Sequence, residues 1–150
     1  MNRLIGLLST TVLSFNVIAG GCPIGMEGST QFTPPTKKSG EIYVDIKAEV
    51  KLDDQAIAAE GWKYRTRTIT FSPGAVVPVH SHDDRPEMAM MKHGEVTIYE
   101  TNCKVPYVMK EGDVYHNELG ISHWAVNDTD DFAVMYVTDL VKTESFPINK

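Results

Sequence analysis

The chain has 150 residues, of which 42% are hydrophobic, and its formal net charge at pH 7 is −6. This length and composition are ordinary for one soluble globular domain. Basic residues are grouped in only two places, as the pair Lys37 and Lys38 and as the pair Arg65 and Arg67. Because binding to nucleic acid requires a concentrated positive surface, the composition argues against nucleic acid as a partner.

Residues 1–21 have the pattern of an export signal. Arg3 supplies a positive charge, residues 4–18 are mostly apolar, and small residues follow up to Gly21. The apolar run is too short and too polar to predict a membrane-spanning helix, and a buried first helix would lack caps and an amphipathic period. We therefore expect a signal peptide over residues 1–21 and a protein exported to the periplasm or cell envelope.

The two cysteines allow alternative modifications. The sequence from Ala19 to Cys22 resembles the cleavage box of bacterial lipoproteins, which would leave a lipid anchor on Cys22. Ala19 stands where that box has a large aliphatic residue, so cleavage after Ala19 by ordinary signal peptidase is the alternative. In that case Cys22 and Cys103 could form a disulfide in an oxidising compartment. For Cys103 itself we expect a buried, unreactive thiol.

The first part of the mature chain combines a linker with an edge strand. Residues 22–40 are rich in Gly, Ser, Thr, Pro and Lys, which is typical of a linker with little regular structure. Residues 41–52 alternate, which predicts an amphipathic edge strand with one apolar face, formed by Ile42, Val44, Ile46, Ala48 and Val50. Residues 53–60 have a short helical pattern that begins at an aspartate cap and ends at Gly61.

The rest of the chain predicts short strands separated by glycines and polar turns. The expected strands cover residues 62–71, 76–82, 87–91, 95–100, 106–109, 114–116, 122–127 and 132–141. Short strands with a turn every eight to twelve residues or so are typical of a β-sandwich or barrel. We therefore expect a single all-β domain over residues 41–150.

Residues 74–94 contain a candidate metal site. His80 and His82 are two residues apart on an expected strand, so their side chains point to the same face. Turn-forming residues follow, which lets the chain double back and place Glu87 beside the two histidines. With His123 from a later strand, three imidazoles and one carboxylate make a ligand set suited to a first-row divalent metal.

The same residues resemble the two sequence motifs of the cupin superfamily. The first motif, G-x5-H-x-H-x4-E-x6-G, is filled at every fixed position, by Gly74, His80, His82, Glu87 and Gly94. The second motif, G-x5-P-x-G-x2-H-x3-N, is filled at all but one position, by Gly112, Gly120, His123 and Asn127. Glu118 stands where the second motif has its proline. This departure concerns the turn before His123.

The resemblance covers about residues 60–141 and implies a double-stranded β-helix, or jelly-roll barrel, with its core motifs at residues 74–127. It also implies one divalent transition metal bound by His80, His82, Glu87 and His123. Iron, manganese, nickel, cobalt, copper and zinc all accept this ligand set, so the motifs do not identify the metal. This ligand set leaves one or two metal positions open for a substrate, water or dioxygen. The fold by itself does not name a reaction.

Two groups of residues are candidates for the surroundings of the metal. Strand alternation sends either Tyr115 and Asn117 or His116 toward the cavity. Arg65 and Arg67 share a strand face, where they would clamp an anionic substrate or pair with acidic side chains. Pairing or solvation is the expected outcome, because unpaired buried arginine is rare.

A third group of candidates lies on the expected strand after the first histidines. Met88, Met90 and Met91 would contribute to a methionine-rich copper site or pack in the core, and core packing is the ordinary role of methionine. His93 lies next to a glycine and is expected at the surface. Glu118 is either a second acid near the site or a turn residue.

The resemblance implies an enzyme that acts on a small molecule, with oxygenase-type chemistry ahead of isomerase, decarboxylase and lyase chemistry. A cupin of the cell envelope that binds a metal or small ligand without catalysis is the alternative, and a barrel used only for subunit association is a third. The complete ligand set argues against the third. A homodimer through the outer strands is a further expectation. A cavity leading to an open metal position would favour the enzyme, and a site closed by Met91 or Tyr115 would favour binding.

Overall fold

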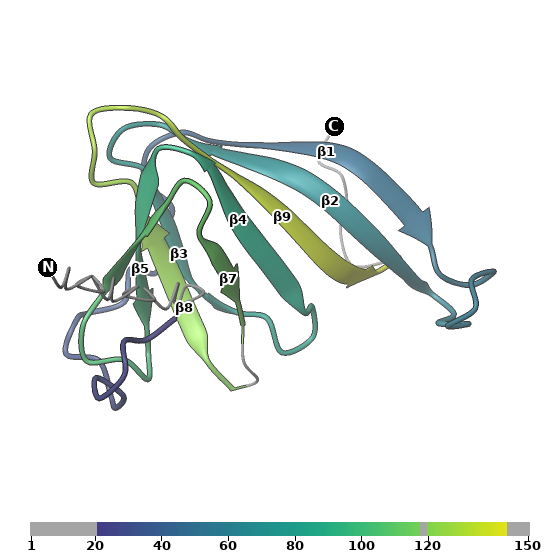
Figure 1. Cartoon of the computed structure of the whole chain (residues 1–150), viewed down its shortest axis with the longest axis horizontal. Coiled ribbons are helices and arrows are strands. Elements are labelled where there is room, and N and C mark those ends of the chain that lie inside the picture. The colour runs from purple at the N-terminus through teal and green to yellow at the C-terminus, as the bar shows by residue number, and fades with distance from the viewer. Residues whose placement is uncertain (1–20, 118–119, 144–150) are drawn as a thin grey trace, which may run out of the picture.

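The computed structural model describes residues 21–117 and 120–143, so residues 1–20 of the expected signal peptide and Glu118 lie outside the described residues. The described part of the chain forms nine β-strands joined by turns and loops (Figure 1). Over the same residues, no helix has the length and apolar character that crossing a membrane requires.

The strands form two antiparallel sheets. The larger sheet has the order β1 (Ile42–Lys51), β2 (Trp62–Phe71), β9 (Ala133–Lys142), β4 (Glu87–His93) and β7 (Val114–His116). The smaller sheet has the order β3 (Val76–Ser81), β8 (Ser122–Val126), β5 (Glu95–Glu100) and β6 (Tyr107–Lys110). In Figure 1, β1, β2 and β9 continue past the smaller sheet as a long arm. This architecture confirms the expected all-β jelly roll.

The core lies between the two sheets and follows from strand alternation. Along β9, every second residue from Ala133 to Val141 is buried, because successive side chains of a strand point to opposite faces. The same alternation buries Val96 and Ile98 on β5. Side chains from both sheets complete the cluster, among them Phe71, Met91, Met109, Tyr115, Met135 and Val137.

β1 lies at the edge of its sheet, as predicted, but its apolar residues do not share one face. Its register against β2 skips one residue, so that Ile46 lies opposite Arg67 and Ala48 lies opposite Thr66. Residues opposite one another in a sheet share a face, and the adjacent Arg67 and Thr66 point to opposite faces. The bulge therefore moves Ala48 and Val50 to the other face. The prediction of one apolar face over residues 41–52 is wrong.

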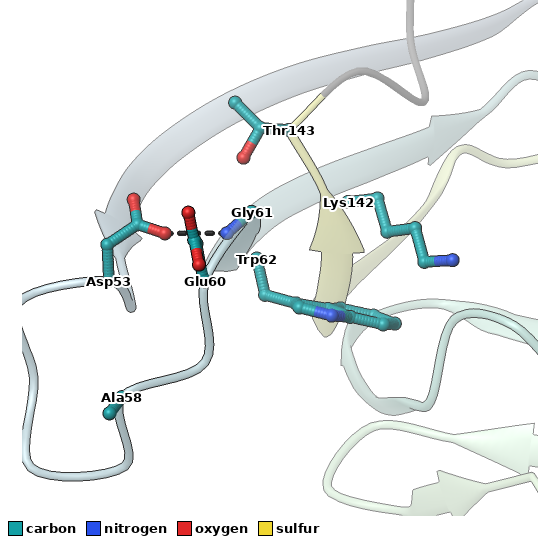
Figure 2. Close-up of a pocket in the computed structure, with 7 residues that line it drawn as sticks. All are labelled: Asp53, Ala58, Glu60, Gly61, Trp62, Lys142 and Thr143. Atoms are coloured by element: carbon teal, nitrogen blue, oxygen red, sulfur yellow. Dashed lines mark hydrogen bonds between the residues drawn. The ribbon is translucent and has the colours of Figure 1, made fainter.

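Residues 53–60 form turns, so the prediction of a short helix is also wrong. Ala58 has a φ of 46°, in the left-handed region, which interrupts a right-handed helix. The carboxylate of Asp53 accepts a hydrogen bond from the backbone N–H of Gly61 at 2.6 Å and does not cap a helix (Figure 2). A segment this short cannot sustain a helix without packing against other elements.

Residues 22–40 contain no strand, but they are attached to the smaller sheet. The backbone N–H of Gly28 donates to the carbonyl of Asn102 at 2.7 Å, and that of Val79 donates to the carbonyl of Pro35 at 2.9 Å. A free linker would not make backbone hydrogen bonds of this kind. The segment therefore forms an irregular cover along the barrel.

Cys103 is not a free thiol, because it forms a disulfide with Cys22 across 81 residues of sequence. Glu27 pairs with Cys103 in a β-bridge, which brings the two segments together. The expectation of an unreactive free thiol is therefore wrong. No local pattern could have revealed the pairing, since it depends on where the segment before β1 lies. A lipid on the Cys22 sulfur and this disulfide exclude one another.

Candidate metal centre

Three histidines meet where the edge strand β3 of the smaller sheet pairs with β8. His80 on β3 lies directly opposite His123 on β8, and His82 follows at the end of β3. One ring nitrogen from each histidine lies within 4.8 Å of those of the other two. The sequence spacing and the antiparallel pairing together place His80, His82 and His123 as predicted.

Hydrogen bonds orient the first two imidazole rings. The Nδ1 atom of His80 donates to the carbonyl oxygen of Pro78 at 2.8 Å, and that of His82 lies 3.3 Å from the carbonyl oxygen of Arg85. Because a carbonyl only accepts, Nδ1 carries the proton and Nε2 keeps a free lone pair. The Nε2 atom of His82 is buried and has no hydrogen-bond partner, as expected of a metal ligand.

The third ring is held by two side chains of the strand that leads to it. The Nδ1 atom of His123 lies 2.6 Å from the hydroxyl of Tyr115 and 3.0 Å from the amide nitrogen of Asn117. His116, between them, is exposed on the other face. Of the two alternatives for this strand, the structure therefore shows Tyr115 and Asn117 facing the histidines.

Burial keeps all three imidazoles neutral. Burial, together with Arg85 and His80, lowers the pKa of His82 to about 3. Burial, together with the other two histidines, lowers the pKa of His123 to about 2. Burial also lowers the pKa of His80. Neutral imidazoles are the form that binds metals, so the site suits a cation near pH 7.

Glu87 lies beside the three histidines but outside the group whose ligand atoms cluster. Its Oε1 atom is 3.2 Å from Nε2 of His82, and its Oε2 atom is 3.2 Å from Arg67 and 3.4 Å from Arg85. Burial raises the pKa of Glu87 against the influence of both arginines. The carboxylate therefore has one oxygen toward the histidines and one toward the arginines.

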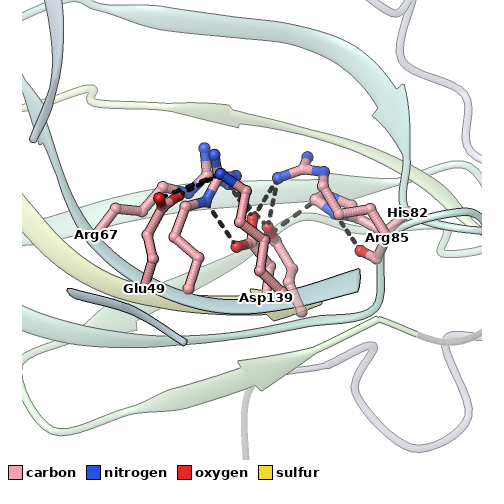
Figure 3. A network of polar contacts seen from close by, with 8 residues as sticks. Glu49, Arg67, His82, Arg85 and Asp139 are labelled. Atoms are coloured by element: carbon pink, nitrogen blue, oxygen red, sulfur yellow. Dashed lines mark hydrogen bonds and ion pairs between the residues drawn. The ribbon is translucent and has the colours of Figure 1, made fainter. Parts of the chain in front are cut away.

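A buried network of charges adjoins the site (Figure 3). Arg65 makes two hydrogen bonds to the carboxylate of Asp139, at 3.0 and 2.8 Å. Arg67 and Arg85 also reach Asp139, at 3.1 and 2.8 Å. Burial raises the pKa of Asp139, but the arginines outweigh it and lower that pKa overall. Pairing of Arg65 and Arg67 with acidic side chains is thus confirmed.

The sequence interpretation missed Arg85 and Asp139. Asp139 had a usable signal, since it falls on the inward positions of an otherwise apolar strand, between Val137 and Val141. A carboxylate at such a position must find a buried partner, because burying an unpaired charge is costly. Arg85 lies in a turn and carried no comparable signal.

A pocket of about 280 Å³ opens onto His80 and His82. It is also lined by Arg67, Arg85 and Glu87. A smaller internal cavity of about 50 Å³ reaches His123 from the core side. The ring of Tyr115 lines that inner cavity and does not line the outer pocket.

A larger cavity, of about 930 Å³, lies elsewhere (Figure 2). It is formed by the turns between β1 and β2, the start of β2 and the end of β9, and is lined by Asp53, Ala58, Glu60, Gly61, Trp62, Lys142 and Thr143. None of these residues belongs to the histidine group, so cavity volume alone does not locate the candidate metal centre.

The methionines of β4 do not surround the histidines. Met91 is buried in the core, whereas Met88 and Met90 are exposed on the other face. Core packing of Met91 is therefore confirmed, and the structure does not group the three sulfurs at the site. His93, at the end of β4, is exposed as expected.

Comparisons with known proteins agree with this fold. Residues 67–139 match the family described as the cupin domain. A predicted oxalate decarboxylase from Thermotoga maritima is 16% identical, with a TM-score of 0.55 over 81% of this chain and 99% of its own. The cupin domain of Cnp3 from Schizosaccharomyces pombe is 13% identical, with a TM-score of 0.51 over 72% and 70% of the two chains.

An oxalate oxidase in complex with the substrate analogue glycolate is 20% identical, with a TM-score of 0.50 over 67% of this chain and 54% of its own. No curated protein matches this chain. At these identities the structures share the fold and establish nothing about activity. The described residues therefore form a jelly roll like that of these structures, and residues 67–139 are similar in sequence to the cupin domain.

Proposed function

We propose that this protein is a metal-dependent enzyme that acts on a small molecule at the three-histidine site. The observation that carries the proposal is the convergence of three neutral imidazoles within 4.8 Å, one of them with a buried, unpartnered nitrogen. Nitrogen ligands of this kind suit a divalent transition metal. Glu87 is the proposed fourth ligand, through the oxygen that faces His82.

The chain supplies a route to this site and the means to orient a substrate. The outer pocket reaches His80 and His82 and is not closed by Tyr115 or Met91, which favours an enzyme over a protein that only holds a ligand. When bound, a metal would supply Lewis acidity or dioxygen activation. An oxygenase-type reaction is the version that the family resemblance implies.

The proposal extends to the compartment and the assembly. The disulfide between Cys22 and Cys103 supports export, because such bonds persist in oxidising compartments. The edge strand β1 exposes Val44 and Ile46, which supports a homodimer formed through this strand.

Elemental analysis of the purified protein tests the metal site. We expect about one transition metal per chain, lost in the His80→Ala, His123→Ala double variant because two of the proposed ligands are gone. A matched double variant, His93→Ala with His116→Ala, removes two exposed histidines and should retain the metal. Equal, negligible metal in all three proteins would exclude the metal-dependent reaction.

A further inference from the structure

The pocket beside the histidines has two chemically different walls. Its basic residues are Lys38, Arg67 and Arg85. Its apolar residues come from β1, β2 and β3, and are Ile42, Val44, Ile69, Val77 and Pro78. A pocket of about 280 Å³ accommodates a small organic molecule.

Two of the pocket's basic residues belong to a buried network of charges. Arg65, Arg67 and Arg85 gather on the carboxylates of Glu87 and Asp139. Arg67 and Arg85 contact the same two oxygens, Oε2 of Glu87 and Oδ2 of Asp139, and Arg65 contacts both oxygens of Asp139. The network therefore holds the guanidinium groups of Arg67 and Arg85 at the wall of the pocket.

Arg67 also has an unused hydrogen-bond donor. Its Nε atom is buried and has no partner in the part of the chain that the structure describes. Lys38, at the same pocket, is exposed and makes no ion pair with any described residue. An acceptor with negative charge in the pocket would be attracted to the basic side chains that line it, those of Lys38, Arg67 and Arg85.

We propose that the pocket binds the carboxylate of a small organic acid whose apolar part lies against the wall formed by β1, β2 and β3. The carboxylate faces Lys38, Arg67 and Arg85 beside the histidines. Such an acid is the substrate class of the enzyme proposed above, and this assignment rests on that proposed function. The apolar wall distinguishes such an acid from an inorganic anion, which has nothing to place there.

Calorimetric titration of the full chain with benzoate, benzamide and inorganic phosphate tests the proposal. We expect benzoate to bind at least about ten-fold more tightly than either of the others, because only benzoate combines a carboxylate with an apolar body. Its affinity should fall as salt is added, since part of the attraction is between charges near the surface. The preference should persist in metal-free protein, because the basic residues belong to the chain.

A pair of matched variants locates the binding site. Val44→Asp places a negative charge at the pocket, and Val50→Asp places the same charge on the other face of the same strand. Both valines are about half exposed, at 53% and 45%, so neither change disturbs the core. We expect Val44→Asp to weaken benzoate binding about ten-fold and Val50→Asp to leave it unchanged.

The outcomes separate this proposal from the metal site. Equal affinities for benzoate and benzamide, in protein that holds its metal, would overturn the organic-acid assignment alone. Tighter binding of phosphate than of benzoate would also overturn it. Absence of metal in the purified protein would overturn the proposed enzyme, whatever the titrations show.

Discussion

At the scale of single residues, the setting of His123 differs from that of the other two histidines. The backbone carbonyls beside His80 and His82 only accept, which leaves Nε2 free, but the partners of His123 both carry donors. Asn117 has a buried amide oxygen without a hydrogen-bond partner. A half-turn of that amide would bring the oxygen to Nδ1 of His123, where it accepts the proton and leaves Nε2 free for a metal.

This geometry predicts that Asn117 positions His123 for metal binding. Asn117→Leu removes the acceptor and should weaken metal affinity about 10- to 100-fold, as loss of a hydrogen-bond partner to a ligating histidine does. Asn117→Asp keeps an acceptor and should restore most of the affinity. Competition with a chelator measures both. The neighbouring His116→Leu, on the exposed face, is the control, and equal affinities in all four proteins would contradict the prediction.

At the scale of elements, the irregular segment before β1 contributes to the stability of the barrel. It is tied to the sheet by backbone hydrogen bonds, by the contact of Phe32 with Tyr99 at 5.2 Å between ring centroids, and by the disulfide between Cys22 and Cys103. The disulfide closes a loop that spans 81 residues, which restricts the unfolded chain.

Removing the disulfide should therefore lower the free energy of unfolding. For Cys22→Ser with Cys103→Ser we expect a loss of about 2–5 kcal/mol, because the unfolded state regains conformational freedom. Urea denaturation of the variant and of the oxidised protein gives the difference. Reduction of the native protein should have the same effect, and a free energy of unfolding that is insensitive to both treatments would contradict the prediction.

At the scale of the whole molecule, the buried histidines link stability to pH. Their pKa values are lowered in the folded metal-free protein, to about 3 for His82 and about 2 for His123, from an ordinary 6.5 in the unfolded chain. Between these limits the unfolded chain binds more protons than the folded one. The free energy of unfolding therefore decreases as pH falls below 6.5, and the histidines have no such effect above it.

Thermal unfolding of the metal-free protein between pH 8 and about pH 4 should show this loss. Glu87 acts in the opposite direction, because its raised pKa favours proton uptake by the folded state, but three histidines outnumber it. The His80→Ala, His123→Ala variant should lose much of the dependence. A midpoint in the native protein that stays constant from pH 6.5 to 4 would show that the imidazoles are not kept neutral by burial.

Much of the fold follows from short-range features of the sequence. Alternation and turn residues predicted every strand within a few residues; for example, the strand expected at 87–91 continues to His93. The two-residue spacing of His80 and His82 placed both rings on one face. Such features are local, since they depend on side-chain direction along one strand.

The local arguments failed where the partner strand decides the outcome. The bulge in β1 reverses the faces of Ala48 and Val50, and nothing in residues 41–52 by themselves marks the skipped position. At residues 53–60 turns replace the expected helix, because a segment this short forms a helix only where it packs against other elements.

The sequence by itself determined the strands and the three histidines, because periodicity and spacing are written along the chain, and the resemblance to the two cupin motifs implied the jelly roll. Only the tertiary structure decided the disulfide of Cys22 with Cys103 and the sharing of Asp139 and Glu87 by arginines from β2 and the turn before β4. Apart from the contact of Arg85 with Glu87, these contacts join segments far apart in the chain, and their geometry exists only once the chain has folded.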